Sequence, residues 1–250
     1  MKFSDITNAA LGLLYPPVCA HCGEYLDFRS RQALCAACSD KFESELDSVC
    51  KDCFKFVREC ECVPDRASKK IRKTFHAAEY DPLSESVTRS LVLTAKDHNY
   101  KYVGELMADV LSDTLSSHMT SFKGVVLTYV PRSPSKVKKT GVDQAKRTAE
   151  LLSEKTGIPV VHALQRHGSR EQKHLDSDER HENAYSSYTA NSSAINLIEG
   201  KTVILYDDIM TTGATVSACS DILKTMGAKT VYCLTFGRAY RKKSTDDQIS

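Results

Sequence analysis

The sequence predicts an α/β protein with a parallel sheet and a small cysteine-rich module at its start. Three near-continuous apolar runs, at 124–131, 201–206 and 229–236, are separated by segments with helical patterns. Buried strands without apolar–polar alternation, joined by helices, are typical of a parallel sheet with right-handed crossovers. Eight of the ten cysteines fall within the first 62 residues, and the 250 residues suffice for one core plus a small appended unit.

Composition excludes several classes of protein. A hydrophobic content of 41% and a charged content of 26% are those of an ordinary soluble protein. The net charge of +2 creates no field over the whole protein that would demand nucleic acid or an acidic membrane. No apolar run reaches the ~18 residues of a membrane span. Residues 1–17 predict a short amphipathic helix stopped by Pro16, too polar for a secretory signal, so we expect a cytoplasmic protein with reduced thiols.

The pattern divides the chain into a cysteine-rich region at 1–70, an α/β domain at 71–240 and a disordered tail at 241–250. Within the second region we expect, in order, a strand at 75–80, helices at 91–95 and 102–115, a strand at 124–131, a helix at 142–155, a strand at 158–163, a polar segment at 165–194, a strand at 201–206, a helix at 213–226 and a strand at 229–236.

The polar segment is rich in hydrogen-bond donors. A loop of about 30 residues inside a compact α/β domain is uncommon and is usually functional or disordered. Its donors suit an anionic ligand: Gln165, Arg166, Arg170, Gln172, Lys173, His174, Arg180 and His181.

The stretch ILYDDIMTTGAT, residues 204–215, predicts a phosphate site beside a sugar site. Asp207 and Asp208 follow an apolar strand, and ligands of open α/β sheets sit beyond the carboxyl ends of the strands. A helix beginning near Gly213 presents unpaired N–H groups that hold phosphate without lysine. Hydroxyl donors are added by Thr211, Thr212 and Thr215. The acids would repel a phosphate but suit sugar hydroxyls or a divalent cation, so the combination describes ribose 5-phosphate.

Other interpretations of this stretch explain less. Simple capping of the next helix needs one acid or threonine and accounts for neither the doubled acid nor three threonines. A Walker-type loop is excluded, because Ile195 stands where Gly200-Lys201-Thr202 would require glycine and the strand follows instead of preceding. No G-x-G-x-x-G occurs.

VILYDDIMTTGAT resembles the signature with which type I phosphoribosyltransferases bind phosphoribosyl pyrophosphate (PRPP). The wider chain is similar to the ComF family of competence-associated proteins, through LLYPPVCAHCG, the paired cysteines, VPRSP, GVDQA and an R-x5-Q-x2-L-x4-R-x2-N pattern. The resemblance implies a type I phosphoribosyltransferase-like sheet with helices on both faces, an N-terminal double zinc ribbon, and a Mg²⁺-dependent transferase. It also implies a link to DNA uptake or DNA utilisation.

The resemblance further implies roles for individual residues. The PRPP-binding set is Asp207, Asp208, Thr211, Thr212, Gly213, Ala214, Thr215, the pyrophosphate loop around Val130 with Pro131, Arg132 and Ser133, and Lys96. The catalytic set is Asp207, Asp208, Arg166, Gln172 and Arg180, of which the last three belong to the insert pattern with Ser169, Leu175 and Asn183. A basic loop closing over the site would exclude water, and Arg132, Arg166, Arg170 and Arg180 are candidates for neutralising the leaving group.

One segment departs from the family. The usual R-G-F-N-Q is Thr140, Gly141, Val142, Asp143 and Gln144 here, and Lys138 and Lys139 replace the charge but not a bidentate guanidinium. Two hypotheses therefore stay open. The first is a PRPP-using transferase with an unidentified acceptor. The second is a non-catalytic PRPP-binding module that handles single-stranded DNA or regulates competence or DNA-processing proteins.

The cysteines predict structural zinc. The first set has the spacing of a tetrahedral Cys₄ site, with Gly23 forming the knuckle, and consists of Cys19, Cys22, Cys35 and Cys38. The second set indicates a second zinc ribbon and consists of Cys50, Cys53, Cys60 and Cys62. One zinc or two, and pairing across the two sets, stay open. Four thiolates leave no open position, so the metal is expected to be structural. Cys219 and Cys233 are expected in the core.

A basic edge near this module is expected from Arg58, Arg66, Lys69, Lys70, Arg72 and Lys73. It is either a nucleic-acid contact or a solvated face.

Overall fold

The chain alternates strands and helices from residue 73 onward. The computed structural model describes residues 16–27, 29–64, 67, 69–97, 101–167 and 186–240. The elements, in chain order, are α2 (Ala36–Leu46), η1 (Val57–Glu59), β1 (Lys73–Glu79), α3 (Val87–Asp97), α4 (Lys101–His118), β2 (Val125–Tyr129), α5 (Pro134–Thr140), α6 (Gln144–Thr156), β3 (Leu164–Arg166), β4 (Tyr188–Ala190), η3 (Ser192–Ala194), α8 (Ile195–Ile198), β5 (Thr202–Met210), α9 (Ala214–Thr225) and β6 (Thr230–Arg238). The expected amphipathic helix at 1–17 lies almost wholly outside the described residues, and the expected tail at 241–250 lies entirely outside them.

Four strands form one parallel sheet in the order β1-β6-β5-β2, which confirms the predicted fold class. Tyr206 of β5 is paired on one side with Tyr129, the last residue of β2. On the other side β5 stays paired with β6 as far as Met210 and Arg238. The last four residues of β5 therefore project beyond the end of β2, and the two acids lie in this projection.

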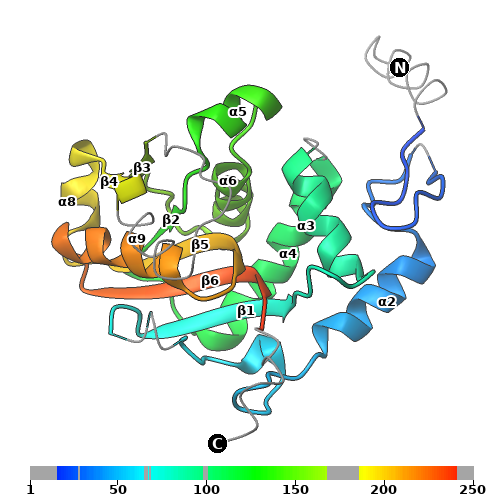
Figure 1. Ribbon diagram of the computed structural model, residues 1–250, viewed down its shortest axis with the longest axis horizontal. Helices are drawn as coiled ribbons and strands as arrows, with labels where there is room; N and C mark the ends of the chain where they lie inside the picture. Colours follow the sequence, from blue (N-terminus) through cyan, green and yellow to red (C-terminus); the bar gives the residue numbers. More distant parts are fainter. Residues whose placement is uncertain are drawn as a thin grey trace, which may run out of the picture.

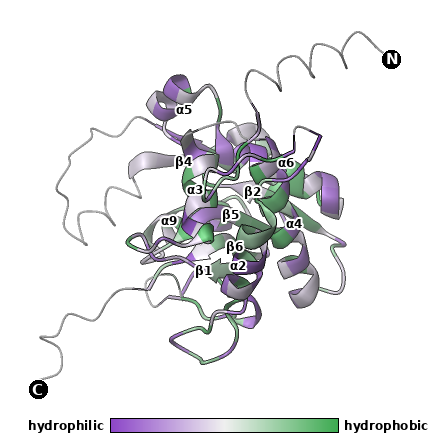
Figure 2. Ribbon diagram, turned by 90° about the vertical axis from the view of Figure 1, so that its right-hand side faces the viewer, coloured by the Kyte–Doolittle hydropathy of each residue, from purple (hydrophilic) through white to green (hydrophobic). Residues whose placement is uncertain are grey.

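Both faces of the sheet are covered by helices, as expected (Figure 1). Along β5, Ile204 and Tyr206 join the core under α4 and α6, whereas Val203 and Leu205 join the core under α9. This alternation follows the two-residue period of a strand, and it sends successive residues to opposite faces. Figure 2 shows the apolar centre of the sheet and the polar α5 at the periphery.

The cysteine-rich region packs against the α/β domain. The ring of Phe42, on α2, stacks on Phe236 of β6 with 6.1 Å between ring centroids. Val57 forms a separate small core with Cys50 and Cys60. These contacts fix the position of the cysteines relative to the sheet.

The structure differs from the expected secondary structure at three places. The run at 158–163 forms only an isolated bridge between Val160 and Leu127, because Pro159 has no N–H to donate to a ladder. The polar segment begins and ends in an antiparallel pair, β3 and β4. The helix α5, whose residues are all at least partly exposed, was not anticipated. Among the described helices, none combines the length and the apolar character needed to cross a bilayer.

Candidate functional site

The two acids lie inside β5, not after it. The expected strand ended at Tyr206, but continued pairing with β6 extends β5 through both carboxylates to Met210. By the two-residue period of the strand, Asp207 lies on the face of the sheet covered by α9 and Asp208 on the face covered by α6. Asp208 accepts a hydrogen bond from the hydroxyl of Tyr206 at 3.1 Å, and the backbone N–H of Asp208 donates to Asp207 at 2.9 Å. Adjacent residues thus bring two carboxylates to one end of the sheet on opposite faces.

Burial raises the pKa of Asp207, and the neighbouring charge of Asp208 raises it further, to about 7. The positive charges of Lys96 and Arg166 act in the opposite direction, as does the N–H of Asp208. A carboxyl group held near half-ionisation at neutral pH, at the open end of a sheet, is typical of a functional site. It can accept hydrogen bonds from hydroxyl groups once a ligand is bound.

The turn after the acids prepares a helix N-terminus. Gly213 is the N-cap of α9 with a φ of +79°, a conformation that glycine adopts without steric penalty. Among the described residues, no side chain caps the helix. Only the N–H of Ala214 donates a long hydrogen bond, of 3.5 Å, to the hydroxyl of Thr212 within the described turn. Thr211 is exposed, while Thr212 and Thr215 are half-buried. The first amides of α9 are therefore available to an anion.

The loop after β2 lies beside the acids. The N–H of Arg132 donates to a carboxylate oxygen of Asp143 at 3.1 Å, and its guanidinium donates to the carbonyl of Lys96 at 3.2 Å. The ammonium of Lys96 lies 4.0 Å from Asp208. Asp143 also caps α6 by accepting the N–H of Lys146 at 3.2 Å. Two cations from separate elements thereby meet at the negative end of β5.

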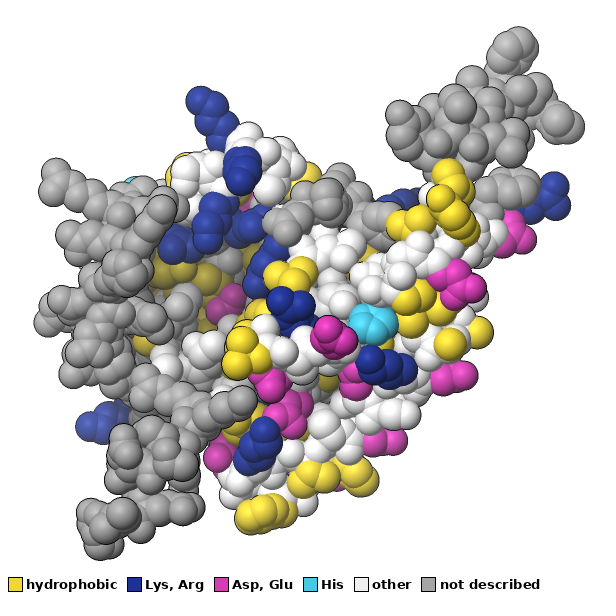
Figure 3. Space-filling model, turned by 45° about the vertical axis from the view of Figure 1, so that its right-hand side comes forward, with side chains coloured by type: hydrophobic (Ala, Val, Ile, Leu, Met, Phe, Trp, Pro, Cys, Tyr) yellow, Lys and Arg dark blue, Asp and Glu magenta, His cyan; other side chains and the backbone are white. Residues whose placement is uncertain are grey.

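A basic rim overlooks this end of the sheet. Figure 3 shows Lys and Arg side chains gathered above a hollow in which an acidic side chain is visible. The helix α5 contributes three exposed lysines, Lys136, Lys138 and Lys139. Carboxylates below and cations above suit a ligand with both hydroxyl and phosphate groups.

The first cysteine cluster consists of Cys19, Cys22, Cys35 and Cys38, and the second of Cys50, Cys53, Cys60 and Cys62. Within each cluster the four sulfur atoms lie within 4.8 Å of one another. The Sγ atoms of Cys22 and Cys35 are 3.7 Å apart, and those of Cys50 and Cys60 are 3.3 Å apart. A tetrahedral zinc site with Zn–S bonds of about 2.3 Å separates its sulfurs by about 3.8 Å. Both clusters therefore fit zinc, and cysteines pair within the two sets.

Each cluster contains the same kind of backbone turn, a zinc knuckle. In each, the N–H of the residue after the second cysteine donates to the carbonyl of the first, from Gly23 to Cys19 and from Phe54 to Cys50. Both residues have positive φ, +75° for Gly23 and +60° for Phe54. Burial favours the neutral form of the Cys19 thiol, but backbone N–H groups, led by that of Cys22, lower its pKa to about 7. That N–H pattern stabilises a thiolate, the form that binds metal.

Similar proteins are known for most of the chain. A phosphoribosyl transferase domain matches residues 137–249. Competence protein ComFC of Streptococcus pneumoniae is 26% identical over 79% of this chain and 84% of its own length. Competence protein ComFC of Bacillus subtilis is 28% identical over 85% of this chain and 80% of its own. The chain is thus similar to two ComFC competence proteins, and it contains a match to a phosphoribosyl transferase domain. Among solved structures, the allosteric regulatory enzyme of purine biosynthesis aligns with a TM-score of 0.37 and 22% identity over 53% of this chain, which spans 26% of that chain's length.

The structure brings several of the predicted site residues together. Lys96, Arg132 and Asp208 meet as described above. Arg166, on β3, lies over the ring of Tyr188 with 5.2 Å between the guanidinium carbon and the ring centroid. Its charge also lowers the pKa of Asp207. Pro131 is buried and Ser133 is the N-cap of α5. Ser169, Arg170, Gln172, Leu175, Arg180 and Asn183 lie outside the described residues.

The sequence did not lead us to expect a role in the site for two residues, Tyr206 and Asp143. Tyr206 is fully buried and holds Asp208, and its position directly before the acids was the available signal. Asp143 was noted only as a departure from the family, yet it organises the loop at Arg132. The helix was expected at 142–155 but begins at Gln144, so an acid near the expected start could have identified Asp143 as the cap.

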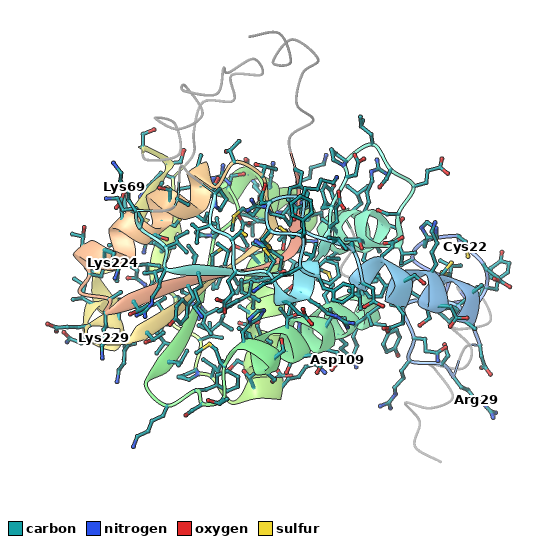
Figure 4. All side chains as sticks on the ribbon, turned by 90° about the horizontal axis from the view of Figure 1, so that it is seen from below. Cys22, Arg29, Lys69, Asp109, Lys224 and Lys229 are labelled. Carbon is teal, nitrogen blue, oxygen red and sulfur yellow. The ribbon has the colours of Figure 1, made fainter. Side chains whose placement is uncertain are left out.

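The expected basic edge is largely neutralised. Arg58 is paired with Asp47, Lys70 with Asp221 and Lys73 with Glu61. Lys69 and Arg72 are exposed, and Figure 4 shows Lys69 far from Cys22 of the first cluster. Arg66 lies outside the described residues. The described part of this edge is therefore mainly a surface of ion pairs.

Proposed function

We propose that this protein binds PRPP at the carboxyl end of β5 and transfers its phosphoribosyl group to a base, an amine or a nucleotide-derived acceptor. The observation that carries the proposal is the pairing of Asp207 and Asp208 with the uncapped start of α9 at Gly213. Carboxylates accept hydrogen bonds from a ribose diol, whereas helix amides hold a phosphate.

In this proposal each part of the chain has one task. Asp207 and Asp208 orient the ribose through its 2- and 3-hydroxyls and stabilise positive charge that grows on the sugar as the pyrophosphate departs. The turn at 211–215 fixes the 5-phosphate. Arg132 and Lys96, on the other side of the acids, stabilise the negative charge that develops on the leaving group.

Mg²⁺ fits the site as a partner of the ligand. Carboxylate oxygens are suitable donors, but among the described residues no third acid, histidine or cysteine joins the pair, so most oxygens around the ion would come from PRPP and water. Bound there, Mg²⁺ would supply charge neutralisation for the pyrophosphate.

The insert is proposed to supply Gln172 and Arg180. The N–H of His167 donates to the carbonyl of Ser187 at 2.9 Å, which extends the β3–β4 pair and holds the two ends of segment 168–185 together. Arg166, the last residue of β3, lowers the pKa of Asp207, which supports the proposal that the insert acts at this site. Its basic residues are proposed to close over the leaving group and exclude water.

We also propose a role in DNA uptake or DNA utilisation, because both relatives are competence proteins. A cytoplasmic location belongs to this proposal: all ten cysteines of the described chain are free thiols, which suits a reducing compartment and metal binding. Single-stranded DNA and DNA-processing proteins are the proposed partners.

A screen of bases and amines for PRPP-dependent pyrophosphate release, with Mg²⁺ present, tests the transferase function. Wild-type protein should release pyrophosphate faster with one class of acceptor, and the D207N/D208N variant should not. Tight PRPP binding without release by any acceptor would support the alternative, a non-catalytic PRPP-binding module. That alternative also predicts binding of single-stranded DNA that weakens steeply with salt.

A further inference from the structure

We infer that the second cysteine cluster positions the phosphate-binding turn, so that metal bound to this cluster is required for tight binding of the ribose 5-phosphate group. The inference rests on the proposed function, since it concerns the turn at 211–215. It predicts that the two clusters, alike in their local geometry, differ in their effect on the ligand.

The chain leaving the second cluster runs directly over the turn. A Cβ placed on Gly213 would lie 3.2 Å from the Cβ of Ala67 and 3.4 Å from the Cβ and Cγ of Pro64. Ala67 is fully buried and belongs to the same core as Met210 and Val216, which flank the turn on either side. The glycine that starts α9 is thus covered by the segment that follows Cys62.

That segment is fixed at both ends. On the side of the cluster, the hydroxyl of Thr74 donates to the carbonyl of Cys62. The N–H of Ala67 donates to the carbonyl of Pro64 at 2.8 Å, and the N–H of Ile71 donates to the carbonyl of Ala67 at 3.0 Å. At the other end of the segment, Lys70, just before Ile71, forms an ion pair with Asp221 on α9. A shift of Cys62 would therefore be transmitted to Pro64 and Ala67.

A second connection joins the cluster to the residue before the turn. The buried guanidinium of Arg238 lies 3.2 Å from a carboxylate oxygen of Asp52, which is located between Cys50 and Cys53. The same guanidinium lies 3.4 Å from the sulfur of Met210. Arg238 also stacks over Tyr240, whose ring packs against the second cluster. The second cluster therefore contacts the turn through two independent paths.

The first cluster has different neighbours. His21 hydrogen-bonds Ser90 at 2.9 Å, and Thr94 donates to the carbonyl of Ala20 at 3.5 Å, so this cluster packs against α3. In the described part of the chain its contacts are with α3 and the core around α2, not with the turn. Figure 4 places Cys22 at the far end of the molecule.

The test uses ribose 5-phosphate as the probe, because it engages the turn and the acids without the pyrophosphate loop. Dissociation constants are measured by calorimetry on zinc-loaded protein, and zinc content is measured by colorimetric release. C53S should lose one zinc and bind ribose 5-phosphate at least tenfold more weakly than wild type. P64G should keep both zinc ions but bind about threefold more weakly. P17G is the matched control, since Pro17 lies at the first cluster, where its carbonyl accepts the N–H of Leu26, and it should bind as wild type does.

Reciprocal coupling gives a readout that does not depend on C53S being folded. In the C22S variant the remaining zinc is that of the second cluster. Saturating ribose 5-phosphate should raise the affinity of this cluster for zinc, measured at equilibrium by competition with a chelator, by the same factor by which the metal tightens ligand binding. Wild-type affinity in C53S after zinc loss would overturn the inference, as would identical affinities of P64G and P17G or an unchanged zinc affinity in C22S. Absence of ribose 5-phosphate and PRPP binding in wild type would instead contradict the proposed function itself.

Discussion

Replacing Asp207 by asparagine should stabilise the fold while it removes the proposed ligand site. Asp207 is half-buried, and its carboxyl group lies beside Asp208; the loss of solvation and the neighbouring charge raise its pKa from 3.8 to about 7. Folding therefore disfavours the ionised form. The resulting loss of stability is absent below about pH 3.8, grows as the pH rises and is fully developed above about pH 7, because the unfolded chain binds fewer protons than the folded one over this range.

The magnitude follows from the shift. At roughly 1.4 kcal/mol per pKa unit, ionisation of Asp207 lowers the free energy of unfolding by roughly 4 kcal/mol at pH 8 and roughly 3 kcal/mol at pH 6. Asparagine has the shape of the protonated acid and can still accept the N–H of Asp208. D207N should therefore gain about these amounts, with the gain larger at pH 8 by roughly 1 kcal/mol.

Urea unfolding of zinc-loaded protein at pH 6 and pH 8 measures both quantities. D113N is the matched control, because Asp113 is exposed on α4 and its replacement should change stability by less than about 0.5 kcal/mol. A D207N variant no more stable than wild type at pH 8, or equally stabilised at both pH values, would refute the reasoning. A carboxylate kept at such a cost to stability is expected where function requires it.

Three further changes test neighbouring parts of the site. G213A should lower the free energy of unfolding by roughly 1–2 kcal/mol, because the residue has a φ of +79° and its Cβ would crowd Ala67. G124A has a φ of +72° and free space, so it should lose less; equal losses in urea unfolding would contradict the packing argument. D143A should lose about 1 kcal/mol through the cap of α6 and should weaken pyrophosphate binding measured by calorimetry, because Arg132 loses its anchor; unchanged pyrophosphate affinity would show that Asp143 does not organise the loop. Chelation of the native protein should release two zinc ions per chain, and release of one would mean that only one cluster binds metal.

The strands of the sheet were predictable because their residues are buried on both faces. The apolar runs at 124–131, 201–206 and 229–236 differ from β2, β5 and β6 mainly at their ends. Those ends depend on partners distant in sequence. Pairing of Met210 with Arg238 carries β5 through Asp207 and Asp208, and no local pattern indicates where that pairing stops.

Two other features could not be predicted from the local pattern of apolar residues. The helix α5 has the sequence PSKVKKT and buries no residue, so its periodicity carries no signal. The run at 158–163 is apolar enough to suggest a strand, but a single proline limits it to one bridge. In the site, the acids and the glycine of the turn were identifiable by residue type. The contact of Pro64 and Ala67 with Gly213 was not, because it depends on the path of the chain after the second cluster.

Titration calorimetry of PRPP with Mg²⁺ into wild-type protein and into D207N/D208N tests the central claim most directly. If the acid pair holds the ribose and the start of α9 holds its phosphate, wild type binds and the double variant, with its zinc content intact, loses binding. Equal heats and affinities for the two proteins, or no heat with wild type, would contradict the account.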